Sequence, residues 1–136
     1  MGNIHAIGEV VQITTDEVLT WNQIYRLSAQ ALGVEARLVH ISSDFLIACD
    51  PSLEGPLLGD KSVSVMFDNS KLKRLVPGFH AEIRYDQGVR RTADYVLSHP
   101  EVQIPNPEFD QWCDDVIEAH SLGMQSFIAR HPRKYL

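Results

Sequence analysis

Apolar side chains recur at helical spacing in several stretches of the chain, and these stretches predict helices. The clearest stretch follows Thr20, which forms a T-x-x-Q capping box with Gln23, and it ends before Gly33, a residue suited to a helix C-terminus. We therefore expect a helix over residues 21–32. Caps, prolines and the same spacing predict further helices over residues 44–48, 70–75, 86–99 and 107–121. Beyond residue 121 the apolar pattern weakens, which predicts a mobile tail.

Four other stretches carry β-branched or alternating apolar residues, which are typical of strands. They cover residues 9–14, 37–41, 63–67 and 81–84. The first strand, the helix over 21–32 and the second strand together have the length of a βαβ unit with parallel strands. Residues 50–60 hold two prolines and two glycines and predict a loop. The expected fold class is therefore α/β, a small α+β-like domain with one short parallel βαβ unit plus helices.

Length and composition favour one globular domain. The chain has 136 residues, of which 44% are hydrophobic and 22% charged. We expect residues 1–99 to form this domain. Residues 100–136 are expected to form a proline-rich connector, an amphipathic helix and the tail, because three prolines fall within 100–107 and an apolar stripe follows them.

Charge and cysteine usage exclude several classes of partner. The net charge of −6 and a pI of about 5.4 disfavour general nucleic-acid binding, which depends on basic surface. No stretch approaches the ~20 apolar residues of a membrane helix, and the N-terminus lacks the features of a secretory signal. Cys49 and Cys113 are isolated, and the six histidines lack the spacing of metal ligands. We expect a soluble cytoplasmic protein without a metal site or a membrane partner.

One segment is a candidate binding site. A glycine-containing loop before residue 60 leads to Lys61, Ser62 and Ser64, and an ammonium group with hydroxyls suits a phosphate or a sugar. The alternative interpretation is a loop lysine followed by the polar face of an edge strand. His40, on a predicted strand, is expected to face a cleft, the core or ordinary surface. The paired acids Asp16 and Glu17 are expected to favour a turn and the N-terminus of the coming helix.

Four sequence segments share the order of a known family. They are AIGEVVQITTDE (6–17), LTWNQI with ALG (19–24 and 31–33), GD with FDNSKLKR (59–60 and 67–74) and YDQGVRRT (85–92). Together they resemble the C-terminal, substrate-binding part of extended short-chain dehydrogenases/reductases, the family of NAD-dependent epimerases and dehydratases. The resemblance covers about residues 3–99.

The resemblance implies a substrate-binding role. In this family an N-terminal Rossmann domain binds NAD or NADP and holds a catalytic Tyr-x-x-x-Lys pair, and this chain resembles only the half that lacks them. We expect a fragment that is not catalytic alone, with no catalytic residue and no cofactor site of its own. Its substrate would be a small molecule, a nucleotide sugar or another sugar derivative. Leu57-Leu58 stand where nucleotide-sugar members often carry an arginine. The residues expected to line the cleft are Lys61, Ser62 and Ser64, with His40 behind them.

A second hypothesis is a stand-alone interaction module without catalysis. A domain shaped to cover a Rossmann partner has an apolar face that nothing covers when it is alone. Such a face would be buried by self-association or against another chain.

Overall fold

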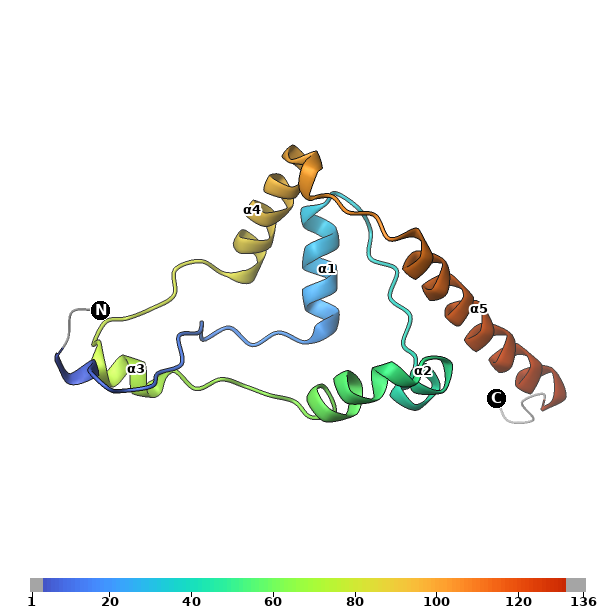
Figure 1. Ribbon diagram of the computed structural model, residues 1–136, viewed down its shortest axis with the longest axis horizontal. Coiled ribbons are helices and arrows are strands. Elements are labelled where there is room, and N and C mark those ends of the chain that lie inside the picture. Colours follow the sequence, from blue (N-terminus) through green and yellow to red (C-terminus); the bar gives the residue numbers. More distant parts are fainter. Residues whose placement is uncertain (1–3, 132–136) are drawn as a thin grey trace. The chain divides into compact units, whose positions relative to one another are not determined.

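The computed structural model describes residues 4–131, and Figure 1 shows the course of the chain. Its α-helices are α1 (Trp21–Ala31), α2 (Ser43–Cys49), α3 (Ser70–Leu75), α4 (Tyr85–Ser98) and α5 (Pro107–Arg130). Shorter helical turns are η1 (Ile4–Ala6), η2 (Pro51–Leu53), the π-helical η3 (Gly55–Asp60) and η4 (Pro100–Val102). The helices are therefore joined by short turns and by non-helical connections.

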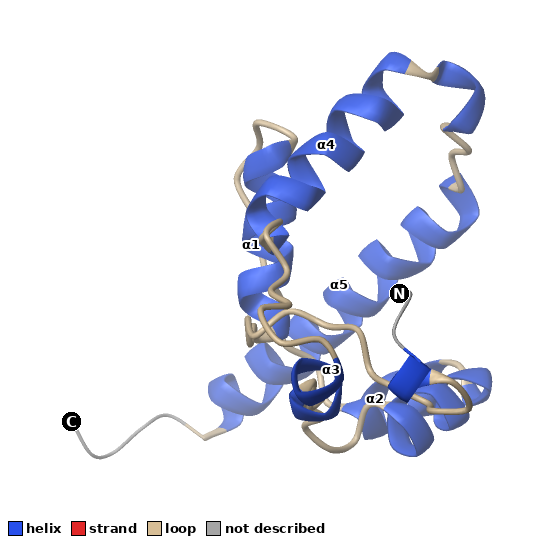
Figure 2. Cartoon of the chain, turned by 90° about the vertical axis from the view of Figure 1, so that its left-hand side faces the viewer, coloured by secondary structure: helices blue, strands red, loops and turns tan. Residues whose placement is uncertain are grey.

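The predicted α/β fold with a parallel βαβ unit is wrong. Residues 4–131 contain helices and loops but no strand, as Figure 2 shows. All four predicted strands, at 9–14, 37–41, 63–67 and 81–84, are non-helical segments without a strand partner. The physical reason is that β-branched, alternating residues favour a strand only where a second strand completes the hydrogen-bond ladder. Here no described segment takes that place.

The helix predictions are confirmed where local capping determines them. Thr20 and Gln23 form the expected capping box of α1, and Gly33 follows the helix with a φ of 72°. Asn106 caps α5, since its side chain accepts a hydrogen bond from the Phe109 amide at 3.1 Å. These contacts involve residues within a few positions of one another, so the sequence alone specifies them.

Two local predictions need correction. The loop expected over 50–60 contains η2 and η3, because Pro51 suits a first helical position and the Asp50 side chain accepts a hydrogen bond from the Ser52 amide at 2.9 Å. The tail expected to be mobile beyond residue 121 is helical to Arg130. The rest of that tail, from 132 to 136, lies outside the described residues.

The described chain forms two compact units. The first unit comprises the described residues up to Arg37 together with Val65–Gln103, and the second comprises Leu38–Ser64 together with the described residues from Ile104 onward. This division cuts across the predicted 1–99 domain and 100–136 extension, which remain a prediction about independent folding.

The first unit contains α1, α3 and α4. Helices α1 and α4 lie side by side (Figures 1 and 2). Leu72 on α3 is 1% exposed and Ala93 on α4 is 7% exposed, so these two side chains form the buried apolar part of the unit. Helix α1, by contrast, has no buried residue.

The second unit contains α2, η2, η3 and α5. Val116 on α5 is its buried apolar side chain, with 6% exposure. The ring of Phe45 on α2 meets His120 on α5 edge-on, with ring centroids 5.5 Å apart. The Nδ1 atom of His120 is buried and has no hydrogen-bond partner among the described residues. The contact between α2 and α5 at this point is therefore a ring contact and not a hydrogen bond.

Many large apolar side chains remain exposed in the described part of the chain. Val10 and Ile104 are each 87% exposed, and Ile7 is 78% exposed. Extensive exposed apolar surface is typical of chains that bind a partner or a ligand. Within residues 4–131, no helix has the length and apolar character needed to cross a membrane.

Candidate functional site

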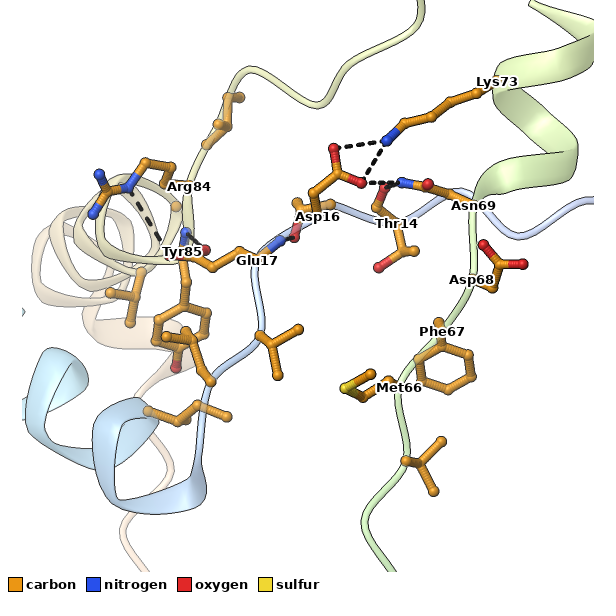
Figure 3. Close-up of a pocket in the computed structure, with 18 of the residues that line it drawn as sticks. Thr14, Asp16, Glu17, Met66, Phe67, Asp68, Asn69, Lys73, Arg84 and Tyr85 are labelled. Atoms are coloured by element: carbon orange, nitrogen blue, oxygen red, sulfur yellow. Dashed lines mark hydrogen bonds and ion pairs between the residues drawn. The ribbon is translucent and has the colours of Figure 1, made fainter.

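The candidate site is a cavity in the first unit. It has a volume of about 900 Å³, within the usual range for a ligand pocket. Figure 3 shows its walls, which come from three segments distant in sequence: residues 14–19, residues 65–70, and residues 83–85 with 88 and 89. Ile24, Lys73 and Thr92 complete the lining.

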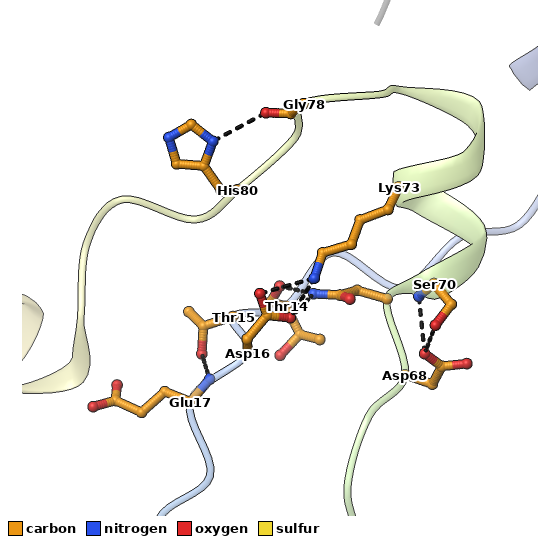
Figure 4. Close-up of polar contacts among 10 residues, drawn as sticks. Thr14, Thr15, Asp16, Glu17, Asp68, Ser70, Lys73, Gly78 and His80 are labelled. Atoms are coloured by element: carbon orange, nitrogen blue, oxygen red, sulfur yellow. Dashed lines mark hydrogen bonds and ion pairs between the residues drawn. The ribbon is translucent and has the colours of Figure 1, made fainter.

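Asp16 is the centre of a polar cluster at this cavity. Both of its carboxylate oxygens accept hydrogen bonds from Lys73 Nζ, at 2.6 and 2.8 Å (Figures 3 and 4). Its Oδ1 atom also accepts a bond from Asn69 Nδ2 at 3.0 Å. The hydrogen bonds from Lys73 and then from Asn69 lower the pKa of the Asp16 carboxyl. Asp16 is therefore ionised at neutral pH and joins the first segment to α3.

Asn69 is the buried polar residue of the cluster, with 7% exposure. Besides Asp16, its Nδ2 donates to the backbone oxygen of Thr14 at 2.9 Å. The preceding residue, Asp68, accepts bonds from the amide and the hydroxyl of Ser70 at the start of α3, which lowers the pKa of the Asp68 carboxyl. Asn69 is thus held between a helix N-terminus and the 14–17 segment, and both of its amide hydrogens have acceptors.

Glu17 links the first segment to α4. Its Oε2 atom accepts a hydrogen bond from the Tyr85 amide, the first of α4, at 2.8 Å. The Arg84 Nε atom lies 3.9 Å from Glu17 Oε1, and the Tyr85 hydroxyl is 3.0 Å from the Ser28 hydroxyl of α1. The paired acids were expected to favour the N-terminus of the coming helix, α1. Glu17 instead accepts its hydrogen bond from the first amide of α4, 68 positions away.

The arrangement combines an apolar wall with polar groups at its rim. Val65, Met66 and Phe67 contribute apolar surface from one segment. Threonine hydroxyls, the Asp68 carboxylate and the groups around Asp16 contribute hydrogen-bonding atoms. A ligand with both an apolar face and several hydroxyls, such as a sugar ring, matches this combination.

The sequence-predicted site residues lie elsewhere. Lys61, Ser62 and Ser64 follow η3 in a short exposed segment, and Lys61 Nζ is 2.8 Å from Asp60 Oδ2. His40 is exposed in the loop before α2. All four belong to the second unit, and none lines the cavity described above. The structure brings the first three together only through their adjacency in sequence, and their role in substrate binding stays a prediction.

Sequence reasoning from spacing missed Asn69 and Lys73 as site residues. Local spacing places Lys73 in the helix predicted over 70–75 and Asn69 directly before it, and gives neither residue a role in a site. The signal that points to them is the resemblance, because Asp16, Asn69 and Lys73 all fall inside its segments. Pairing across more than fifty residues cannot be read from local spacing.

The described residues offer no group of three or more His, Cys, Asp or Glu placed to hold a metal ion. Cys49 and Cys113 are free thiols, and partial burial followed by the nearby Asp110 and Asp114 raises the pKa of the Cys113 thiol. A thiol with a raised pKa is a poor nucleophile at neutral pH.

Comparison with protein-family models, with curated proteins and with solved structures finds no match to this chain.

Proposed function

We propose that this chain is the substrate-binding portion of an NAD(P)-dependent epimerase/dehydratase-like oxidoreductase, and that the cavity of the first unit receives a sugar-type small molecule. The supporting observation is that segments distant in sequence meet at one cavity. Three of the segments that carry the family resemblance contribute to the cavity wall, with residues 14–17, residues 67–70, and residues 85, 88 and 89. Their contacts run through Asp16, Glu17 and Asn69 across 53 to 68 sequence positions.

The cavity does not suit the dinucleotide itself. A pyrophosphate needs a glycine-rich turn or free cations, and the one glycine of this wall, Gly88, lies inside α4. The two basic residues of the wall each lie near a carboxylate, Lys73 near Asp16 and Arg84 near Glu17. The chain's own part is to bind and orient the substrate, which lowers the entropic cost of the reaction.

Ligand-induced shifts of amide NMR signals test this proposal. Neutral methyl glycosides and UDP-glucose are titrated into the protein, and signals of residues 14–19 and 65–70 are expected to move. Phe67→Ala should weaken binding several-fold, because Phe67 lines the wall and is 62% exposed, so its loss costs little stability. The matched control is Phe127→Ala, 59% exposed in the second unit, which should leave binding unchanged.

NADH provides the complementary arm. A thermal-shift measurement with NADH is expected to leave the melting temperature unchanged, because a ligand stabilises only a state that holds its site. An increase in melting temperature with NADH would contradict the assignment of a substrate-binding role alone. Absence of any sugar-induced shift at the cavity signals would contradict the proposal as a whole.

The second candidate is a stand-alone self-association module without catalysis. The observation in its favour is the exposure of large apolar side chains such as Val10, Ile13 and Ile104. Sedimentation velocity over a hundredfold range of protein concentration separates the candidates. A sedimentation coefficient that rises with concentration supports the module, and a constant value favours the substrate-binding portion.

We place either activity in the cytoplasm, because free thiols at Cys49 and Cys113 are typical of a reducing compartment.

A further inference from the structure

The charges of the cavity wall restrict the ligand further. Three carboxylates line it, from Asp16, Glu17 and Asp68, and two cations, Lys73 and Arg84. The wall therefore carries an excess of one negative charge. A ligand that brings its own negative charge meets net repulsion there, whereas a neutral ligand does not.

The two cations are already engaged. Lys73 Nζ is held by both oxygens of Asp16, at 2.6 and 2.8 Å. Arg84 Nε lies 3.1 Å from Asp86 Oδ1 and 3.9 Å from Glu17 Oε1, so two carboxylates face one guanidinium. Both cations are therefore partly neutralised by neighbouring carboxylates, which weakens the attraction that either would offer to a phosphate.

The third carboxylate, Asp68, strengthens the negative side. Its Oδ1 atom accepts both bonds from Ser70, which is a neutral partner. Those bonds, and more weakly the charges of Arg74 and Lys73, lower the pKa of the Asp68 carboxyl, so it is ionised at neutral pH. Carboxylate oxygens accept hydrogen bonds from hydroxyl groups, which a sugar supplies and a phosphate dianion does not.

We infer that this cavity selects a sugar moiety that carries no negative charge and rejects its phosphorylated counterpart. The inference rests on the proposed function and specifies the substrate class for the same site. It also implies that any phosphate of a larger substrate lies outside this cavity.

Matched pairs of ligands test the inference. Methyl glucoside, methyl galactoside and N-acetylglucosamine are compared with their 6-phosphates in titrations of the full chain at low salt, with the amide signals of residues 14–19 and 65–70 as the readout. We expect at least one neutral sugar to bind, and its 6-phosphate to bind about tenfold more weakly or worse. Raising the ionic strength to about 0.5 M should narrow that difference, because salt screens charge repulsion.

Asp68→Asn provides the charge variant. It removes one negative charge and keeps an oxygen that can accept the hydrogen bond from the Ser70 amide. The difference in affinity between each sugar and its 6-phosphate should therefore become smaller. The control is Asp94→Asn, an exposed acid of α4 outside the cavity wall, which should not change the difference.

The outcomes separate the two proposals. The charge selection would be overturned if the phosphorylated sugars shifted these signals and bound as tightly as the neutral ones. It would also be overturned if the difference in affinity did not respond to salt or to Asp68→Asn. Either result would leave the substrate-binding role intact. No response to any of the six ligands would overturn both.

Discussion

The contacts inside the first unit differ in kind from the contacts inside the second unit. In the first unit, directional hydrogen bonds from Asp16, Glu17 and Asn69 join segments that are 53 to 68 positions apart. In the second unit, Phe45 and His120 make an edge-on contact between their aromatic rings. Directional bonds fix the relative positions of side chains, and this is why the cavity with organised polar groups lies in the first unit.

The side-chain hydrogen bonds of the second unit, by contrast, include short-range ones. Ser42 accepts from the Phe45 amide, and Gln111 donates to Asp115 on the same turn of α5. Such bonds stabilise individual helices and do not position one segment against another. Under the proposed function, we expect the first unit to bind the ligand and the second unit to have a structural or partner-binding role. Four predictions test this comparison, from the largest expected effect to the smallest.

Leu72→Ala should have the largest effect. Leu72 is 1% exposed, and removal of a buried leucine side chain costs about 2–5 kcal/mol. The loss should appear as faster amide hydrogen exchange in α1, α3 and α4, measured by NMR. The control is Leu97→Ala, 59% exposed on α4, which should stay within about 0.5 kcal/mol of the wild type. Equal effects of the two variants would show that Leu72 does not anchor the first unit.

Asn69→Ala should destabilise the first unit selectively. It removes bonds to Thr14 and Asp16 from a side chain that is 7% exposed, at a cost of about 1–3 kcal/mol. Its counterpart is Asn106→Ala, which removes the cap of α5 and should cost about 1 kcal/mol in the second unit. Hydrogen exchange resolved by residue measures both. If each variant loosened both units equally, the division into two units would be wrong.

Acid should loosen the first unit before the second. The lowered pKa values belong to carboxyls of the first unit, where Lys71 acts on Glu9, Lys73 on Asp16 and Ser70 on Asp68. A folded-state pKa below the unfolded one stabilises the fold above the unfolded pKa of about 4, and this contribution is lost as the pH falls through the folded value.

Hydrogen exchange measured from pH 6 downward to about pH 2.5, corrected for the intrinsic exchange rate, checks this order. Asp16→Asn should flatten the pH dependence in the first unit. An earlier loss of protection in α5 than in α3 would contradict the prediction.

Lys61→Ala should have the smallest effect on stability. Lys61 pairs with its neighbour Asp60 in an exposed ion pair, a class that contributes little. The unfolding midpoint in urea should match the wild type. The variant also tests the sequence-based site, because weaker binding of a phosphorylated ligand is expected if Lys61 contacts it. Unchanged affinity would remove Lys61 from the site.

The helices follow from the sequence because their determinants are local. The Thr20–Gln23 capping box, the positive φ at Gly33 and the Asn106 cap all lie within a few residues of the element they define. The predicted strands failed for the opposite reason. The alternating pattern at 63–67 favours extended backbone, but a strand forms only when another segment pairs with it.

The features of the candidate site likewise fall into those that the sequence indicated and those that only the tertiary structure decided. Motif order along the sequence pointed to the segments around Asp16, Asn69 and Lys73, and composition established the acidic balance of the chain. Only the tertiary structure decided that these segments meet at one cavity, that Asp16 binds Lys73, and that Lys61 belongs to the other unit. Helix caps depend on neighbours in the chain, whereas ion pairs and cavity walls depend on how distant segments pack, which local spacing does not encode.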